Sequence, residues 1–425
     1  MPDSLAEVLN RDCRCISIDH AALERETRRQ LGDSGIALPP WAESSLFAQV
    51  PVFVSRAHLQ TMHEVIVAVH ALVQSPTYRQ IVLERAPAIA RHCVRQHGVY
   101  FGYDFHLGVD GPALIEVNTN AGGPLLNLLL ARAQQLCCEQ RERLVLAGDP
   151  IETLDAEFVA MFQNEWRLAR GDAPLGTIAI VDDEPERQFL HPEFMLFRQL
   201  FRRSGWQAFV LSPEQLRQSS DGLYFEDQRI DLVYNRLVDF YFEESTHQAL
   251  RQAYLEDKVV VTPHPRAHAL YADKRNLITL RDSELHRDSG LSEIQSERLV
   301  AHIPETKIVE ASDADRLWGD RKRWFFKPIH GYGGKAAYRG DKLTRSTFEQ
   351  IVGRDYVAQR IVPPSQRHVE VNGDVVPLKL DLRCFAYDTD VQLVAARLYH
   401  GQTTNFRTVG GGFAPVFTEV REARE

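Results

Sequence analysis

The chain contains 425 residues, of which 44% are hydrophobic and 25% charged, and its mean hydropathy is -0.29. These values are typical of a globular protein, and the length exceeds one ordinary hydrophobic core, so we expect two or three packed units. The net charge of -9 and the pI near 6.0 exclude the basic footprint of a nucleic-acid-binding protein, and the lack of a long apolar run or a secretory signal predicts a cytoplasmic protein without a membrane span.

The first part of the chain predicts two helices. Residues 1–55 are interrupted by prolines and give no clear pattern. Apolar residues then recur at helical spacing, with Ser55 as the expected N-cap. A second helix is expected over 77–97, and Gly98 marks its end.

A hairpin with acidic residues in its strands is expected over 99–118. Asp104 lies in the first strand, and Glu116 and Asn118 share one face of the second. Carboxylate and amide oxygens suit Mg²⁺. A carboxylate such as Glu116 is costly in an apolar strand unless it is paired or metal-bound; the alternative is an edge strand whose carboxylate faces water. A long helix is expected to follow over 125–144.

Strands and helices alternate over 177–262, after a helix at 155–170 and a linker at 171–176. This order predicts an open parallel sheet of the Rossmann type. The turn after the first strand has no glycine fingerprint, which disfavours NAD. Asn235 and Arg236 lie at the C-terminal end of a predicted strand, where such sheets bind ligands, so they are candidates for binding a substrate carboxylate. The alternative for Arg236 is a surface ion pair.

The clearest local motif is Lys327, followed by a loop that contains Gly331, Gly333 and Gly334. Glycines let backbone N–H groups approach phosphate oxygens, and the lysine at the strand end supplies a fixed positive charge. The loop does not match the Walker A pattern. It predicts a phosphate-binding lid loop that becomes ordered when ATP binds; the alternative is a plain β-turn with a surface lysine.

The last part of the chain is rich in strands and collects several charges. Asp381 and Arg383 are two residues apart and therefore share one face of a strand, and Arg397 lies on the following strand. Asn405 and Arg407 come next. Several charges that face one way from a sheet indicate a polyanionic ligand, although exposed sheet faces also carry charges.

In their order along the chain, these motifs resemble ATP-grasp ligases such as glutathione synthetase and the ribosomal-protein glutamate ligases. In that family two lysines hold the nucleotide phosphates and a Gln-containing strand contacts adenine. The resemblance therefore implies ATP bound through Lys274, Lys327, Gly331, Gly333, Gly334, Gln359, Arg360, Ile361, Asp381 and Asn405. It also implies Mg²⁺ at Asp104, Glu116 and Asn118, catalytic roles for Arg383 and Arg397, and substrate binding by Asn235, Arg236 and Arg407.

One departure from the family is large. Family members end with a glycine-rich strand and an E-x-N metal motif, whereas here GYDF and IEVN lie within 102–118. The simplest explanation is circular permutation, which is tolerated when the original termini lie close together at the surface. The chain then resembles permuted ATP-grasp proteins related to glutathionylspermidine synthetase, over 77–125 and 174–417.

The expected fold is therefore an α/β ATP-grasp fold in circularly permuted order, with a Rossmann-like domain. The expected parts are an N-terminal extension (1–76), the permuted part of the large lobe with the metal motif (77–145), a helical linker (146–171), the Rossmann-like domain (172–265), the small lid lobe (266–358) and the first part of the large lobe (359–425).

The resemblance implies an ATP-dependent carboxylate–amine ligase that forms an amide or peptide bond through an acyl phosphate and releases ADP and phosphate. The expected substrates are a small-molecule carboxylate and an amine, such as an amino acid, a polyamine or a short peptide. The alternatives are a phosphotransferase that uses the same ATP site and a nucleotide-binding regulator without chemistry.

Overall fold

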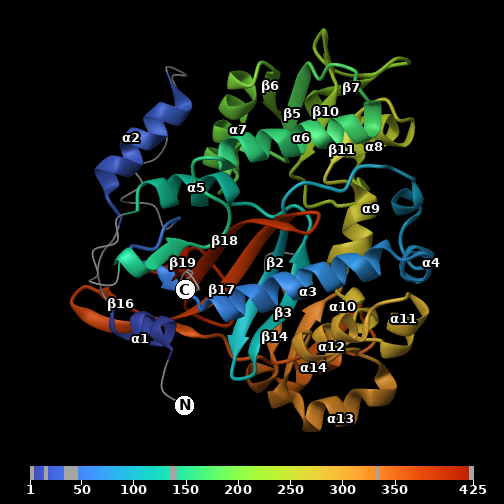
Figure 1. The fold of residues 1–425 in the computed structure, drawn as a ribbon. Helices are drawn as coiled ribbons and strands as arrows, with labels where there is room; N and C mark the ends of the chain where they lie inside the picture. Colours follow the sequence, from blue (N-terminus) through green and yellow to red (C-terminus); the bar gives the residue numbers. More distant parts are fainter. Residues whose placement is uncertain are drawn as a thin grey trace.

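Three units, each built on its own β-sheet, are stacked in the computed structural model (Figure 1). An eight-stranded sheet lies in the centre, a four-stranded parallel sheet lies above it in this view, and a four-stranded antiparallel sheet lies below. The structure describes residues 4–13, 18–32, 46–134, 141–331, 334 and 336–420.

The central sheet joins strands from both ends of the chain. Its main order is β1-β19-β18-β17-β2-β3, while β16 pairs with β17 and β4 with β19. The strands are β1 (Val52–Phe53), β2 (Phe101–Gly108), β3 (Gly111–Asn118), β4 (Leu144–Leu146), β16 (Gln366–Val371), β17 (Asp374–Tyr387), β18 (Asp390–Tyr399) and β19 (Gly412–Glu419). The expected hairpin is thus confirmed as β2–β3, and its first strand pairs antiparallel with β17.

Helices of the N-terminal region cover one face of this sheet. The helices packed around it are α1 (Leu5–Asp12), α2 (His20–Leu31), α3 (Arg56–Gln74), α4 (Pro76–Glu84) and α5 (Pro124–Arg132). Ser55 caps α3 as expected, because its side chain accepts from the backbone N–H of His58. Met62, Ile66 and Val69 of α3 pack into the same core as alternate residues of β17 and β18. The opposite face of the sheet is therefore left for other contacts.

The second unit contains the parallel sheet, in the order β11-β10-β5-β6. Its strands and helices are β5 (Thr177–Val181), β6 (Gln207–Leu211), β10 (Leu232–Asn235), β11 (Val260–Thr262), α6 (Leu154–Arg170), α7 (His191–Arg203) and α8 (Gln248–Leu255), with a small sheet of β7 (Leu216–Gln218), β8 (Leu223–Phe225) and β9 (Gln228–Ile230) beside them. Alternate strand residues enter two different cores, one with α6 and α7 and the other with α8. The near-continuous apolar strands reflect this burial on both faces.

The third unit is the antiparallel sheet β12-β15-β13-β14. It contains β12 (Thr306–Ile308), β13 (Trp324–Pro328), β14 (Tyr338–Arg339), β15 (Tyr356–Arg360), α13 (Ala314–Gly319) and α14 (Arg345–Ile351). Four short helices connect the parallel sheet to it: α9 (Pro265–Ala267), α10 (Asn276–Thr279), α11 (Ser283–Asp288) and α12 (Glu293–His302). Within the described residues, no helix is long and apolar enough to cross a membrane.

Two predicted helices are wrong in length. The helix expected over 77–97 ends at Glu84 and is followed by a 3-10 turn at Ala88–Arg91, because Pro87 lacks an N–H group and disfavours the helical conformation of the residue before it. The helix expected over 125–144 ends at Arg132, and its predicted last residue, Leu144, is instead the first residue of β4, which pairs with β19. Strand pairing outweighs the apolar helical periodicity there.

Candidate active site

A row of charged side chains crosses the face of the central sheet that α3 does not cover. The strand register places Glu116 opposite Asp104, Asp104 opposite Arg383, and Asp381 opposite Arg397. Cross-strand partners lie within contact distance of one another. The alternation that puts Leu380 and Leu382 into the α3 core therefore turns these charges to the other side.

Asp104 is the centre of this row. Its carboxylate accepts hydrogen bonds from Arg383 Nε at 2.6 Å and Nη2 at 2.7 Å, from Arg397 Nη2 at 2.8 Å and from Asn118 Nδ2 at 3.0 Å. Arg397 Nε also donates to Asp381 Oδ1 at 2.6 Å. The Thr404 hydroxyl donates to the other Asp381 oxygen. Arginine–carboxylate pairs with two parallel bonds fix geometry strongly.

Burial and charge act in opposite directions on this network. Burial alone would raise the pKa of Asp104, but Arg383 and Arg397 outweigh it and the pKa lies below its usual value. Asp104 and Asp381 correspondingly raise the pKa of Arg397 against the effect of burial. Asp104 and Arg397 are therefore ionised at neutral pH. Asp104 holds two guanidinium groups, so its role as a metal ligand stays a prediction.

The second group lies next to this row and contains Glu116 and two lysines. Lys327 Nζ donates to the backbone oxygen of Ile115 at 3.2 Å, and to Gln359 Oε1 at 2.9 Å. Gln359 Nε2 donates to the same Ile115 oxygen at 3.2 Å. Glu116 Oε1 accepts from Asn118 Nδ2 at 3.1 Å. Strands β13 and β15 of the antiparallel sheet thus contact β3 of the central sheet at the predicted metal motif.

Glu116 and Lys327 affect the pKa values of one another. Burial would raise the pKa of Glu116, but Lys274 and Lys327 together lower it. Burial lowers the pKa of Lys327, and Glu116 opposes that effect. The carboxylate is therefore ionised at neutral pH, in a site where two lysines can balance its charge.

The glycine-rich loop follows Lys327 and lies close to Lys274. The Lys274 ammonium donates to the Gly331 backbone oxygen at 2.5 Å. Gly334 has a φ of +68°, and a Cβ atom there would lie 3.0 Å from Thr403 Cβ, so glycine permits both the conformation and the close approach. Gly333 lies outside the described residues. The structure therefore brings Lys274, Lys327 and the start of the loop together.

The residues of the predicted adenine-binding strand contact other parts of the protein. Gln359 bridges Lys327 and β3, as described above. Arg360 pairs with Glu305 at 3.2 Å, with its guanidinium carbon 4.5 Å from the centre of the Trp324 ring. The Ile361 N–H donates to the Arg323 oxygen at 2.9 Å. The Ile361 N–H is therefore engaged in this conformation, and contact with adenine there stays a prediction.

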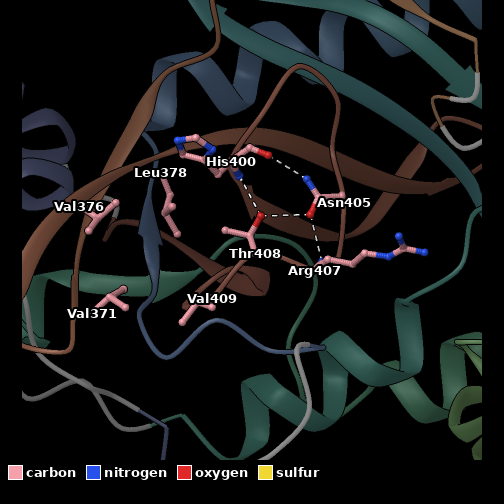
Figure 2. Close-up of a pocket in the computed structure, with 8 residues that line it drawn as sticks. All are labelled: Val371, Val376, Leu378, His400, Asn405, Arg407, Thr408 and Val409. Carbon is pink, nitrogen blue, oxygen red and sulfur yellow. Dashed lines mark hydrogen bonds between the residues drawn. The ribbon is translucent and has the colours of Figure 1, made fainter.

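Asn405 and Arg407 lie apart from the charged row, in a loop beside a hollow of about 420 Å³ (Figure 2). Asn405 Nδ2 donates to the His400 oxygen at 2.8 Å, and Asn405 Oδ1 accepts from Arg407 N at 3.0 Å and Thr408 Oγ1 at 3.1 Å. The Arg407 side chain extends away from the valines that line the hollow. Asn405 therefore shapes the loop, which reaches the charged row through Thr404.

Asn235 and Arg236 are buried at the C-terminal end of β10. Asn235 Nδ2 donates to the Pro263 oxygen at 3.2 Å and its Oδ1 accepts from the Leu237 N–H at 3.1 Å. Arg236 is only 6% exposed, so the alternative of a surface ion pair is wrong. Arg236 Nη1 donates to the Asn120 oxygen at 2.7 Å. Both side chains contact protein backbone, and substrate binding by them stays a prediction.

Sequence reasoning missed several buried polar residues around the site. Glu193 is fully buried on α7 and accepts backbone hydrogen bonds from Gly123 and Leu125. An acidic residue within an apolar helical face is the signal that could have identified it. Thr404 has no comparable signal, because a hydroxyl in a polar loop is unremarkable in sequence.

A further cluster of possible metal ligands lies in the parallel-sheet unit and comprises Asp183, Glu244 and His247. His247 bridges Asp239 at 2.7 Å and Asp183 at 2.9 Å. Burial opposes protonation of His247, but these carboxylates raise its pKa to about 9. Without a metal ion, His247 is therefore protonated at neutral pH and forms ion pairs with Asp239 and Asp183.

No family model and no curated protein matches the chain. Among solved structures, the apo form of a glutathione synthetase-like effector, GSS30, from Globodera pallida has a TM-score of 0.56 over 93% of this chain and 96% of that chain, at 13% identity. A Methylobacillus flagellatus KT protein assigned as a gamma-glutamylcysteine synthetase has a TM-score of 0.46, with 86% and 89% covered at 11% identity. The ATP-grasp ligase PsnB, complexed with a minimal precursor, Mg and ADP, has a TM-score of 0.29, with 58% and 90% covered at 15% identity.

The first of these likenesses covers nearly the whole of both chains and shows a common fold. The other two TM-scores are too low to define one. The chain therefore shares the α/β fold of this glutathione synthetase-like effector, which agrees with the resemblance of its motifs to glutathione synthetase.

Proposed function

We propose, from this fold and from the geometry of the site, that the chain is an ATP-dependent carboxylate–amine ligase. One observation carries the proposal: Lys327 contacts the strand that bears Glu116 and Asn118, through a hydrogen bond that spans 212 positions in sequence. Phosphate-directed lysines and a carboxylate–amide pair suited to Mg²⁺ are the two halves of a nucleotide site. Neither the lysines nor the carboxylate–amide pair alone would make a site for ATP with Mg²⁺.

We also propose that the ATP-grasp segments follow one another in circularly permuted order. The support is that β2–β3, from the first third of the chain, completes a sheet whose other long strands come from its end. On the same proposal, 172–265 is a Rossmann-like domain, 266–358 is the lid lobe, and 359–425 forms the large lobe with 77–145. The parallel strand pairing within the first of these ranges supports a Rossmann-like reading.

The residues present fit ATP and Mg²⁺. Lys274 and Lys327 offer two ammonium groups to phosphates, and the backbone at Gly331 and Gly334 can approach a ligand closely. The Glu116 carboxylate and the Asn118 amide would hold Mg²⁺, which keeps several water ligands and is usually bound by one or two carboxylates. When bound, Mg·ATP would supply the phosphoryl group that converts a substrate carboxylate to an acyl phosphate, from which an amine displaces phosphate.

The chain itself would contribute position and charge. Arg383 and Arg397 are held rigidly by Asp104, so their remaining donor atoms are fixed for an anionic reactant without reorganisation. Thr404 links this rigid row to the loop that carries Arg407. The exposed Arg407 is placed on a loop that can approach a bound carboxylate substrate. No protein nucleophile is needed in such a scheme.

The proposal is tested by ADP release against pools of amino acids, polyamines and short peptides, with hydroxylamine added. A ligase releases ADP only when a carboxylate substrate is present, and hydroxylamine traps the acyl phosphate as a hydroxamate. A phosphotransferase instead gives a stable phosphate ester and no hydroxamate. A regulator binds ATP without substrate-dependent release of ADP. Either of these two results refutes the ligase proposal.

A further inference from the structure

The loop that follows the proposed metal motif is held by the parallel-sheet unit. This loop, Thr119–Gly123, connects β3 to α5 and is mostly buried. Buried backbone groups need partners, and here many of the partners come from elsewhere in the chain. Four residues of the parallel-sheet unit contact the loop: Leu190, Glu193, Arg236 and Leu237.

Arg236 holds the carbonyl side of the loop. Its Nη1 donates to the Asn120 oxygen at 2.7 Å and lies 3.4 Å from the Ala121 oxygen. The guanidinium lies over the rings of Tyr234 and Phe194, 5.4 Å and 5.9 Å from their centroids. These rings fix the plane of the guanidinium, so Arg236 acts as a rigid donor.

Glu193 holds the N–H side of the same loop. Its carboxylate oxygens accept from Gly123 N at 2.9 Å and 3.0 Å and from Leu125 N at 3.1 Å. Gly122 lies between Arg236 and Glu193, since a Cβ atom there would be 2.8 Å from Arg236 Nη2 and 3.5 Å from Glu193 Oε2, and it would also be 2.3 Å from Leu190 Cδ1. The loop therefore fits tightly against the unit and cannot shift without displacing one of these side chains.

The metal motif lies directly before the loop that Arg236 and Glu193 hold. Asn120, which Arg236 holds, is two residues beyond Asn118, and an extended chain spans only about 3.3–3.6 Å per residue. Asn118 in turn donates to Asp104 and Glu116. A displacement of the loop is therefore transmitted to both proposed metal-binding side chains.

We propose that Glu193 and Arg236 are positioning residues that fix the end of β3 so that Glu116 and Asn118 can bind Mg²⁺. This proposal rests on the ligase function proposed above. It replaces substrate binding as the role of Arg236, because Gly122 and the loop carbonyls cover the guanidinium. The parallel-sheet unit would thus set the affinity of a metal site to which it contributes no ligand.

The test measures Mn²⁺ binding by water-proton relaxation, with ATP present, in the full chain and in the variants Glu193→Gln, Arg236→Lys and Gly122→Ala. Residues behind a metal ligand usually change affinity about 10- to 100-fold, so we expect half-saturating Mn²⁺ to rise at least about 10-fold in each variant. ATP affinity measured in EDTA should stay within about twofold, because the lysines are untouched.

Arg251→Lys is the matched control, since Arg251 Nη1 donates to the Tyr241 oxygen at 2.7 Å in another loop of the same unit. It should change neither affinity. Gly122→Ala retains both charges and disturbs the packing of the loop against Leu190 and Arg236, so it tests the link even if a charge variant does not fold. If the Mn²⁺ affinity is unchanged in both Arg236→Lys and Gly122→Ala, the positioning role alone is refuted. If the wild-type chain does not bind Mn²⁺ in the presence of ATP, the ligase proposal and the positioning role are both refuted.

Discussion

Replacing Glu116 by Gln should separate metal binding from folding. The change conserves the shape of the side chain and its ability to accept from Asn118 Nδ2, at 3.1 Å in the structure. It removes the only charge that Glu116 would offer to Mg²⁺ and the counter-charge that it offers to Lys274 and Lys327. We expect a severe loss of Mg²⁺-dependent turnover with a mild loss of stability.

The expected magnitudes follow from the contacts. The attraction of a carboxylate to one partly exposed lysine is worth about 0.2–1 kcal/mol, so losing the attraction of Glu116 to two lysines costs about 0.4–2 kcal/mol of folding free energy. At about 2–4 °C per kcal/mol for domains of this size, Tm should fall by less than about 8 °C. Removal of residues behind a metal ligand already costs about 10- to 100-fold in affinity, so loss of a ligand charge should cost at least about 100-fold.

The assay follows ADP release over a Mg²⁺ titration and, in parallel, thermal unfolding. Glu26→Gln is a matched control, because Glu26 is a partly buried carboxylate that contacts Arg29 at 2.6 Å and Arg132 at 3.2 Å, away from the site. It should lower stability by a similar amount without changing the Mg²⁺ dependence. The reasoning is refuted if Glu116→Gln keeps the wild-type Mg²⁺ dependence, or if both variants lose activity equally.

Three other perturbations have definite expected outcomes. Lys274→Ala and Lys327→Ala should each abolish ATP turnover and keep the wild-type circular dichroism spectrum, and normal ATP affinity in both would exclude the phosphate-binding assignment. Asp104→Asn leaves two buried guanidinium groups with one carboxylate and should cost about 3–5 kcal/mol in urea unfolding; a loss below about 1 kcal/mol would contradict this. The raised pKa of His247, about 9, means that its ion pairs stabilise the fold below about pH 6.5 and are lost as pH rises through about 9, so the difference in Tm between wild type and His247→Gln should be largest at pH 6 and small at pH 10.

Local patterns predicted the fold where each motif lies within one element. The hairpin of β2 and β3, the N-cap at Ser55 and the strand that delivers Lys327 follow from alternation, capping and strand length. The placement of Glu116 beside that lysine could also be anticipated. This prediction required the order of motifs in a known family in addition to the local pattern. A contact between strands two hundred residues apart cannot be predicted from the residues around either strand alone.

The rest depended on tertiary contacts that a single sequence does not reveal. The apolar run after Pro124 has helical periodicity, yet α5 ends at Arg132, and Leu144, the last residue of the predicted helix, lies in β4, because β19 provides a partner strand for Leu144–Leu146. The charges of Arg383 and Arg397 were found by their spacing. That one carboxylate, Asp104, binds both of them could be seen only once β2 was placed beside β17.

The N-terminal region, whose role could not be predicted from the sequence, forms part of the central sheet. β1 pairs parallel with β19, and α3 covers the face opposite the charged row. The fully buried Arg367 of β16 donates to the backbone oxygens of Pro51 and Asn10. The face opposite α3 is covered in part by α5, whose Leu125 and Leu129 share a core with Phe385 and Phe413, and the charged row lies on the rest of that face. The N-terminal segment is therefore part of the central unit, because β1 extends the sheet and α3 buries the face opposite the charged row.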